Sequence, residues 1–390
     1  MLAFIKDKYM CTGCTACLSA CPQNCISMVR DEEGFLYPDA SDKCTHCGLC
    51  KRVCPQQKSN NRISPEHQYS YCGVTKSVSS WRKSASGGAF GEIAFCWGDN
   101  STVIYGAAWS DDCRSVVHRG VEYEFIDQLR KSKYIASEMQ GCFREIKTQL
   151  EEGRYVVFSG TPCQVAGLKA FLRCDYEKLL LIDVICHGVG SQSVFGAAIS
   201  ALERQLGGKI QRFEFRSKRS THETDYLSKV CLNSGEEYYL LKDQYIQLFL
   251  SQKCLRPSCG ENCQYRTMNR QSDITIADFK QVSTVFPSLK GTKRNYSTIV
   301  FNSEKALTIL TKLEKRMILY KCDIDDIIKY NPLFAKQGEC NNLRDHFYKE
   351  FVEDNDHAIA SNTVPAVIYP ESLKRRIFDL LPVFIRKLVM

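Results

Sequence analysis

Two short cysteine runs constrain most strongly what this chain can fold into. They read CTGCTACLSACP at residues 11–22 and CTHCGLCKRVCP at residues 44–55, and they share one spacing although few other residues agree. Three cysteines at C-x-x-C-x-x-C can bind three irons of a cubic 4Fe-4S cluster, and the cysteine before proline crosses to the other cluster. The spacing therefore predicts an α+β ferredoxin-like module with two 4Fe-4S clusters. One cluster is expected on Cys11, Cys14, Cys17 and Cys54, and the other on Cys44, Cys47, Cys50 and Cys21.

The redox compartment decides how these thiols are interpreted. The N-terminal MLAFIKDKYM has no long apolar core, and no run reaches the roughly 18 apolar residues of a membrane span. We therefore expect a cytoplasmic protein, in which clustered cysteines bind metal or carry out redox chemistry more often than they form disulfides. Zinc is the alternative metal, but zinc sites usually pair two C-x-x-C units across a longer gap. Cys25 falls outside the spacing and is expected to be an ordinary packed residue.

The formal net charge of +8 must be corrected for the expected clusters. Each oxidised cluster with its four thiolates contributes about −2, so two or three clusters leave the holo-protein at roughly +4 or +2. The lysines and arginines do not gather into one block with interleaved aromatic residues. We therefore expect no nucleic-acid partner.

Beyond the cysteine runs, the chain alternates between short apolar strands and helical patterns. Residues 56–68 are polar and are interpreted as a linker. The predicted strands cover residues 102–109, 154–160, 179–185 and 272–279, and the predicted helices begin at Gly88, Glu138, Gln164 and Ser193. This alternation is typical of an α/β domain with a mixed sheet. The predicted divisions are 1–60 for the dicluster ferredoxin domain, 61–145 and 146–310 for two parts of the α/β domain, and 311–390 for a helical C-terminal extension.

Three segments at strand ends carry further cysteines. Cys163 lies in SGTPCQVAGL, Cys186 in DVICHGVGS, and Cys259 and Cys263 in CLRPSCGENCQYR. Because strand ends converge at one side of an α/β sheet, these four thiols are expected to bind a third 4Fe-4S cluster, with Cys254 as a reserve ligand. The alternative is that Cys163 and Cys186 pack as inert core thiols.

These segments, together with SGGAF (86–90), VIYGAAW (103–109) and RKSKYIAS (130–137), carry a resemblance to a known family. From about residue 8 to residue 305 the chain resembles the coenzyme F(420) hydrogenase/dehydrogenase beta-subunit family, in its form with an N-terminal dicluster ferredoxin domain. The resemblance implies an α/β flavin-binding domain, usually with FAD, that passes electrons between the clusters and the flavin. The residues alone contain neither a G-x-G-x-x-G fingerprint nor a P-loop.

The resemblance also implies roles for individual residues. Lys133 and His187 are expected to be catalytic, and the cofactor-binding residues are expected to be Ser86, Gly87, Gly88, Thr161, Gln164, Gly188 and Asp278. The alternatives are a surface lysine, a structural histidine, a turn-capping aspartate and, for the glycine pair, a plain turn. Two positions depart from the family pattern. Ala277 stands where a glycine is common before Asp278, and SCGENC has one more residue than the usual S-C-x-x-C.

Two functions are therefore expected. The first is an iron-sulfur, flavin-dependent oxidoreductase whose ferredoxin module exchanges electrons with a flavin, which reduces or oxidises a small-molecule substrate or a deazaflavin-like coenzyme. The alternative is an electron-transfer subunit that relays electrons to a partner enzyme and has no substrate of its own. In both cases a ferredoxin or another redox protein is the expected partner. The basic and apolar tail at 370–390 is expected to pack as a terminal helix or to touch an anionic membrane surface.

Overall fold

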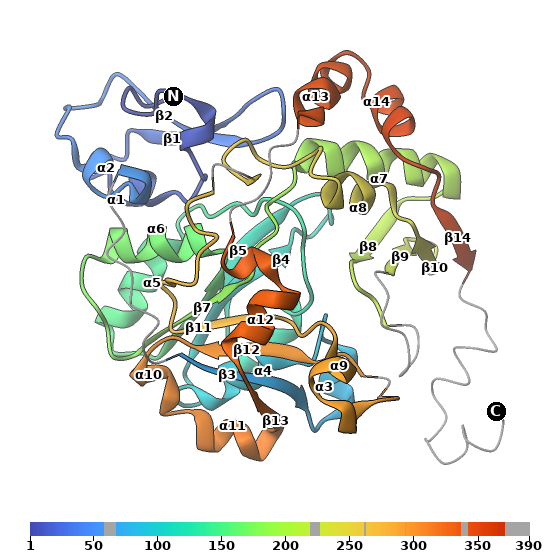
Figure 1. The fold of residues 1–390 in the computed structure, drawn as a ribbon. Helices are drawn as coiled ribbons and strands as arrows, with labels where there is room; N and C mark the ends of the chain where they lie inside the picture. Colours follow the sequence, from blue (N-terminus) through green and yellow to red (C-terminus); the bar gives the residue numbers. More distant parts are fainter. Residues whose placement is uncertain (58–67, 219–226, 261–262, 293, 337–341, 371–390) are drawn as a thin grey trace.

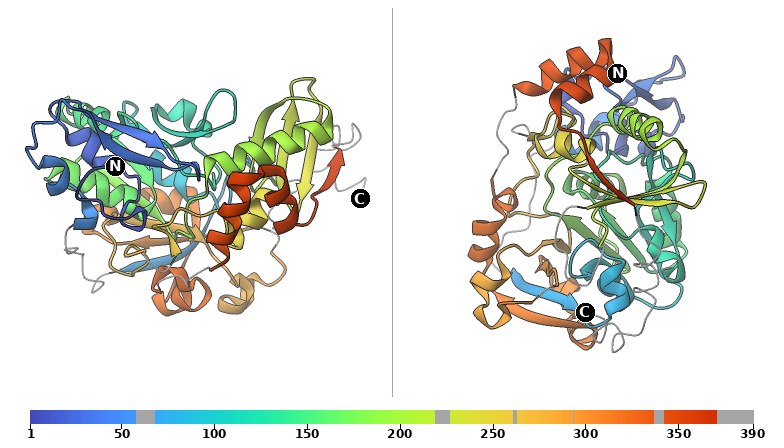
Figure 2. Two further views of the ribbon diagram at one scale, coloured as in Figure 1. Left: turned by 90° about the horizontal axis from the view of Figure 1, so that it is seen from above. Right: turned by 90° about the vertical axis from the view of Figure 1, so that its right-hand side faces the viewer.

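The computed structural model describes residues 1–57, 68–218, 227–260, 263–292, 294–336 and 342–370. Within these residues the strands form a hairpin, a four-stranded sheet and an eight-stranded sheet (Figure 1). The N-terminal module and the last helices lie side by side above the large sheet (Figures 1 and 2). Residues 1–57 and residues 343–362 therefore lie on the same side of the large sheet.

The N-terminal module repeats one local structure in its two cysteine runs. Its elements are α1 (Ala16–Ala20), β1 (Ile26–Arg30), β2 (Leu36–Ala40) and α2 (Leu49–Arg52). The two strands pair antiparallel. Each helix begins one residue before the third cysteine of its run, Cys17 or Cys50. The residues that precede the helices, Thr15 and Gly48, have φ angles of 63° and 71°, so the chain makes the same left-handed turn at both points.

The large sheet has the strand order β13-β3-β12-β11-β7-β6-β4-β5. Its strands are β3 (Tyr69–Thr75), β4 (Val103–Trp109), β5 (Val116–Val121), β6 (Val156–Gly160), β7 (Leu179–Val184), β11 (Ile274–Asp278), β12 (Ser297–Phe301) and β13 (Met317–Cys322). The neighbours β4, β6, β7 and β11 run parallel, and antiparallel strands flank them on both sides. The predicted mixed sheet is confirmed, and the four predicted strands are its parallel centre.

Helices cover both faces of this sheet. They are α3 (Val78–Arg82), α4 (Ala89–Cys96), α5 (Cys142–Glu151), α6 (Pro162–Leu172), α9 (Val282–Val285), α10 (Glu304–Leu307), α11 (Leu310–Arg316) and α12 (Ile324–Tyr330). On one face Ile93 of α4 packs with Val157, and on the other Leu168 of α6 packs with Phe158. These neighbouring strand residues point to opposite faces, which explains why the central strands are apolar throughout. Ala16 of the N-terminal module joins the second core and anchors the module there.

A smaller antiparallel sheet, with the order β14-β10-β9-β8, lies beside the large one. Its strands are β8 (Ile210–Glu214), β9 (Ser228–Leu232), β10 (Glu237–Leu241) and β14 (Val367–Pro370). The accompanying helices are α7 (Gln192–Leu206), α8 (Gln244–Leu250), α13 (Leu343–Glu353) and α14 (Asn355–Asn362). Figure 2 shows α13 and α14 beside α7 and the N-terminal module. The segment predicted as a helical extension thus also supplies β13 to the large sheet and β14 to the small one.

Three sequence expectations concern a membrane-spanning helix, the C-terminal tail and the linker. Among the helices of the described ranges, none is long and apolar enough to cross a lipid bilayer. The tail at 371–390, for which a membrane contact is predicted, lies outside the described residues, and so do residues 58–67 of the predicted linker.

Candidate functional site

The first predicted cysteine set comes together at the start of α1. Cys11, Cys14, Cys17 and Cys54 line one cavity, together with Pro55. Cys14 is buried next to Cys54 and Cys11, and this burial raises the pKa of its thiol to about 12. Such a thiol keeps its proton at neutral pH unless a metal displaces it. The four sulfur atoms therefore fit a cluster whose irons supply the missing positive charge.

The second predicted set lies nearer the surface. Cys44 and Cys47 lie in the loop that leads into α2, next to Cys50 in its first turn, and Cys47 is exposed. Cys21, the predicted fourth ligand, lies with its Sγ atom 3.4 Å from Sγ of Cys25, and Cys25 in turn neighbours Cys44. Cys25 is buried, so it packs as expected, but it does so against the second cysteine set.

Four cysteines from three segments of the chain meet in a third cavity. Cys163, Cys186, Cys259 and Cys263 all line it. Cys163 is in the first turn of α6 and Cys186 follows β7, so adjacent parallel strands deliver them to the same place. In the part of the chain that the structure describes, no group of three or more His, Cys, Asp or Glu side chains is placed to hold one metal ion. A cubic cluster does not require this, because each thiolate binds a different iron.

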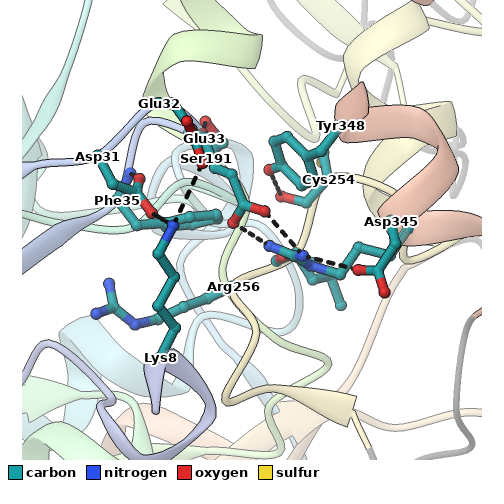
Figure 3. Close-up of polar contacts among 12 residues, drawn as sticks. Lys8, Asp31, Glu32, Glu33, Phe35, Ser191, Cys254, Arg256, Asp345 and Tyr348 are labelled. Atoms are coloured by element: carbon teal, nitrogen blue, oxygen red, sulfur yellow. Dashed lines mark hydrogen bonds and ion pairs between the residues drawn. The ribbon is translucent and has the colours of Figure 1, made fainter. Parts of the chain in front are cut away.

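Cys254, the predicted reserve ligand, lies elsewhere. Its side chain is fully buried in the core that the small sheet and the C-terminal helices share. Its carbonyl oxygen accepts hydrogen bonds from the Tyr348 hydroxyl at 3.1 Å (Figure 3) and from the Ser191 N–H at 3.0 Å. It is not among the described residues that line the third cavity. Cys254 is therefore a structural core residue in this geometry.

Three buried arginines line the third cavity with the cysteines. Arg256, Arg266 and Arg270 are 3%, 4% and 2% exposed. Of these, within the described residues, only Arg270 faces a carboxylate, that of Asp183 at 3.5 Å, and its Nε and Nη1 atoms have no hydrogen-bond partner there. Buried positive charge without a counterion is costly. A 4Fe-4S cluster carries about −2 together with four thiolates, so the lining fits such a cluster in charge as well as in ligands.

The first and third cysteine sets meet at helix α6. Cys163 sits in its first turn, and Gly167, one turn later, packs directly on Cys14. A Cβ atom added at Gly167 would lie 2.8 Å from Sγ of Cys14, so a side chain there would push the two apart. Tyr265 has both Cys163 and Cys14 as neighbours, and Thr12 lines both cavities. The two sets are therefore adjacent.

Thr161 and Gln164, both predicted to bind the cofactor, form the start of α6. The Thr161 N–H donates to Oε1 of Gln164 at 2.8 Å, and the Thr161 hydroxyl lies 3.1 Å from Sγ of Cys163. This capping box fixes the turn that presents Cys163. Gly188 lines the same cavity, next to Cys259. The structure thus places these three predicted residues at the third cysteine set.

The glycine loop before α4 is held by contacts with the large sheet. Ser86 Oγ donates to a backbone carbonyl just before β12, and the Gly87 N–H donates to Ser297 Oγ at 3.0 Å. A Cβ atom at Gly87 would lie 2.3 Å from the carbonyl oxygen of Gly73, so only glycine allows this approach. Gly88 is the N-cap residue of α4. The plain-turn alternative therefore explains Gly87, whose N–H is already engaged.

Basic side chains lie around this loop and around Asp278. Lys218 Nζ donates to the Ser86 carbonyl oxygen at 2.7 Å and lies 3.9 Å from the centroid of the Trp81 ring. Burial, followed by the charge of Arg216, lowers the pKa of Lys218 to about 6. Arg216 makes two hydrogen bonds to the Asp278 carboxylate, at 2.5 and 3.1 Å. Asp278 therefore orients an arginine, and among the described residues its side chain caps no turn.

Lys133 is half-buried at the edge of the same basic group. Its Nζ donates to the Arg130 carbonyl oxygen at 2.9 Å. Desolvation, followed by repulsion from Lys131, lowers the pKa of the Lys133 amine to about 7. Lys131 itself pairs with Glu214 at 2.5 Å. Lys133 thus differs from an ordinary surface lysine, because its amine can take up and release a proton near neutral pH.

His187 is held by contacts that suit a structural residue. Its Nε2 atom lies 3.2 Å from the Phe249 carbonyl oxygen, and its own carbonyl oxygen accepts a hydrogen bond from Arg266. Burial, followed by the Arg266 charge, lowers the pKa of the imidazole, so the ring is neutral at pH 7 and donates from Nε2. The catalytic role of His187 stays a prediction.

Several residues that shape these sites were not predicted. The arginines of the third cavity all lie in CLRPSCGENCQYRTMNR, so the density of arginines around the cysteines was the available signal. Arg216 and Lys218 lie in the basic run RSKR, which carries no motif. Neither signal indicates which way the side chains point.

Comparisons with known proteins give separate matches for the N-terminal module and for the α/β domain. Residues 10–58 match the 4Fe-4S dicluster domain, and residues 153–327 match the C terminus of the coenzyme F420 hydrogenase/dehydrogenase beta subunit. An uncharacterized ferredoxin of Methanocaldococcus jannaschii is 33% identical over 51 residues, which are 13% of this chain and 66% of that ferredoxin. The chain thus spans just under two thirds of the length of that curated relative.

A solved structure was also found to be similar. It is a chain of the F420-reducing NiFe hydrogenase complex from Methanosarcina barkeri, derivatised with xenon, with 16% identity and a TM-score of 0.44. The similarity covers 74% of this chain and 89% of that one. On its two domain matches, this chain contains an N-terminal 4Fe-4S dicluster domain and, at residues 153–327, the C-terminal domain of the coenzyme F420 hydrogenase/dehydrogenase beta subunit.

Proposed function

We propose that this protein is an iron-sulfur, flavin-dependent oxidoreductase with three 4Fe-4S clusters and FAD. The observation that carries the proposal is the third cavity, in which four cysteines from three segments meet three buried arginines. A cluster there would extend the path of the ferredoxin module into the α/β domain. The dicluster domain fits the first two clusters, while the third cluster and the flavin are parts of this proposal.

The burial of the cysteines supports an order for the path. Cys47 of the second set is exposed, Cys14 of the first set is buried, and Cys163 of the third set lies one helical turn from Gly167, which contacts Cys14. One electron would move at each step from one cluster to the next, without transfer of a proton or a change in ligands. The proposed order is therefore second set, first set, third set and then flavin, or the reverse.

The basic group around Ser86 supports an anionic cofactor. When bound, FAD exchanges single electrons with clusters and electron pairs with substrates. The group contains four basic and two acidic side chains, which are Lys131, Lys133, Arg216, Lys218, Glu214 and Asp278. Lys131 and Arg216 pair with the two carboxylates. Lys133 and Lys218, whose amines have pKa values of about 7 and 6, would face the two phosphates and take up protons there.

The remaining predicted residues receive roles from their contacts. Lys133 would exchange a proton at the flavin or the substrate, because its amine has a pKa of about 7. Asp278 would orient Arg216 toward the cofactor, and Ser86 would do the same for Lys218. Thr161, Gln164 and Gly188 would position the cysteines of the third set. His187 would donate a hydrogen bond and stay neutral.

The redox partner would dock at the second set. Lys43, Lys51 and Arg52 are exposed around the loop that carries Cys47, with Asp42 as the nearby acidic residue. This excess of positive charge fits a ferredoxin or another acidic one-electron carrier. We propose that the reaction takes place in the cytoplasm. Because the family name includes coenzyme F420, a deazaflavin is the first two-electron substrate to test.

A second candidate is a relay subunit without a flavin or a substrate. The hydrogen bonds of the Ser86 hydroxyl and the Gly87 N–H favour it, because those groups are already engaged and are not free to bind a pyrophosphate. Acid release of the cofactor distinguishes the two, since the oxidoreductase contains one flavin per chain and the relay contains none. Turnover of F420 by the isolated chain with dithionite-reduced ferredoxin supports only the oxidoreductase.

The third cluster is tested by Cys259→Ser combined with Cys263→Ser. Total iron is expected to fall from about 12 to about 8 atoms per chain, while the two N-terminal clusters keep their EPR signals on reduction. Cys254→Ser is the matched control, because Cys254 is buried nearby but does not line the cavity. Unchanged iron in the double variant, or an equal loss in the control, contradicts the third cluster.

A further inference from the structure

Arg256 reaches from the α/β domain into the N-terminal module. It lies in the loop between α8 and β11 and is 3% exposed. Its Nε donates to the Cys11 carbonyl oxygen at 2.7 Å, and its Nη2 donates to the Leu36 carbonyl oxygen at 2.9 Å. Nη2 also lies 3.7 Å from Sγ of Cys11. In Figure 3 the side chain extends from its loop toward the N-terminal module. The guanidinium therefore contacts a predicted ligand of the first cluster directly.

The N-terminal module forms a closely fitting seat for this guanidinium. Its carbon Cζ lies 4.3 Å from the centroid of the Tyr37 ring and 5.5 Å from that of Phe35. A Cβ atom added at Gly13 would lie 2.9 Å from Nη1. Among the described residues, no carboxylate lies within ion-pair distance of Arg256. Within the part of the chain that the structure describes, the seat thus satisfies donors with carbonyl oxygens and supplies no carboxylate for the positive charge.

The same residue belongs to the third cavity. Arg256 lines it, and the Arg256 carbonyl oxygen accepts a hydrogen bond from the Cys259 N–H at 2.9 Å. The Arg256 N–H in turn donates to the Val189 carbonyl oxygen at 2.9 Å. The backbone of Arg256 therefore shapes the loop that carries two ligands of the third set, while its side chain reaches the first set.

We propose that Arg256 is a positioning residue that fixes the first and third clusters relative to each other and raises the reduction potential of the first cluster. The inference rests on the proposed function, because it requires the clusters. It adds a named residue that controls the driving force for electron transfer between the N-terminal module and the α/β domain.

The physical reason is the charge change on reduction. An electron that passes from the second to the first cluster takes the first from about −2 to about −3 and oxidises the second, with no proton moved and no bond broken. A guanidinium stays protonated in proteins, so its charge favours the reduced form throughout. Hydrogen bonds to cluster sulfurs act in the same direction, and the buried site screens the charge less than water does.

The test is an EPR-monitored redox titration of the anaerobic holoprotein. In Arg256→Gln the potential of the first cluster is expected to shift to a more negative value. In Arg256→Lys, which keeps the charge but loses the forked contact, a smaller shift of the same sign is expected. Because the experiment measures the reduction potential of the first cluster, a variant that only lowers activity through a structural change does not give the expected result. If the glutamine variant loses iron, the lysine variant decides the question.

Arg344→Gln is the matched control. Arg344 is a second buried guanidinium that joins the N-terminal module to the rest of the chain, and it hydrogen-bonds Glu33 rather than a cysteine. Its loss should leave the potentials at their wild-type values. Unchanged potentials in both Arg256 variants, a positive shift, or an equal shift in the control overturns the proposal. A wild-type chain without iron would instead end the proposed function itself.

Discussion

Arg344 of α13 forms a bidentate ion pair with Glu33 at the tip of the β1–β2 hairpin. Nη2 lies 2.5 Å from Oε2, and Nη1 lies 3.2 Å from Oε1, across 311 residues of sequence. The two side chains are 10% and 14% exposed, and Figure 3 shows Glu33 facing the helix that carries Tyr348 and Asp345. A segment outside both family matches therefore holds the ferredoxin module in place.

Breaking this pair should destabilise the protein. Arg344→Met leaves the Glu33 carboxylate buried and unpaired, which costs about 3 kcal/mol of unfolding free energy. Anaerobic urea unfolding measures the loss. Arg204→Met is the control, because the Arg204–Asp356 pair is 60% and 61% exposed and should contribute less than about 1 kcal/mol. Equal effects in the two variants would mean that α13 does not hold the module.

Gly167→Ala should remove the first cluster although alanine favours helices. Alanine normally stabilises a helix interior by about 1 kcal/mol relative to glycine, but here its Cβ would lie 2.8 Å from Sγ of Cys14. We expect a loss of about four irons per chain, measured by iron analysis. Gly196→Ala on α7 is the control, because nothing lies within 4 Å of the added carbon, and it should stabilise the protein. Full iron content in Gly167→Ala would contradict the close approach of α6.

Cys21 and Cys25 should behave differently despite their sulfur contact. Cys21→Ser removes a predicted ligand and should lower the iron content by about four atoms per chain. Cys25→Ser removes only a packed thiol and should leave the iron content unchanged. EPR of the reduced proteins identifies which cluster is lost. A loss of iron in Cys25→Ser with full iron in Cys21→Ser would reverse the ligand assignment.

His118 should make the protein less stable in mild acid. Its ring bonds the Ser137 hydroxyl and the Ser159 carbonyl oxygen, and burial lowers its pKa to about 4. Because the unfolded chain takes up a proton near pH 6.5 and the folded chain does not, stability is full above that pH and falls as the pH drops toward 4. Between pH 7.5 and 5.5 the loss from this group is about 1.4 kcal/mol.

His118→Asn should reduce this pH dependence in anaerobic unfolding measured at both pH values. His346→Asn is the control, since His346 is 69% exposed, and it should keep the wild-type slope. If both variants keep that slope, His118 is not the group that titrates.

Charge reversal at the second cysteine set should slow reduction by an acidic ferredoxin. For Lys43→Glu combined with Lys51→Glu, we expect the second-order rate to fall about 10-fold at low salt and to approach the wild-type rate at high salt. Stopped-flow bleaching of the clusters measures it. Lys312→Glu, an exposed change on α11, is the control. An equal effect at Lys312 would place the docking surface elsewhere.

The parts of the fold that the sequence predicts are those with a local signal. The central strands of the large sheet are apolar on both faces, so β6 and β7 were found from periodicity. β13 and β14 were not, because each pairs with a strand that lies far away in the chain, β13 with β3 and β14 with β10. The cysteine runs carry their ligand pattern within twelve residues, which is why their grouping was predictable.

The site residues follow the same rule, because those with a local sequence signal are predictable and the others are not. The third cysteine set followed from strand ends, but its arginines did not, because the sequence does not show that Arg256 turns toward Cys11 and Leu36. Gly87 has two explanations that use the same residue type, and its close approach to Gly73 and its hydrogen bond to Ser297 favour packing over ligand binding. Lys133 was predicted from resemblance alone, and its half-buried position could not be read from neighbouring residues.

The contact between Gly167 and Cys14 has a consequence for electron tunnelling. Tunnelling slows steeply as the gap between redox centres widens. The electron-transfer rate between centres on two domains therefore fluctuates when the domains move relative to each other. Here Cys163 and the surface that touches Cys14 belong to one helix, α6, eleven residues long. The gap between the proposed first and third clusters is therefore set by how closely this one helix packs on Cys14, and a motion that separates α6 from the N-terminal module should widen the gap and slow tunnelling.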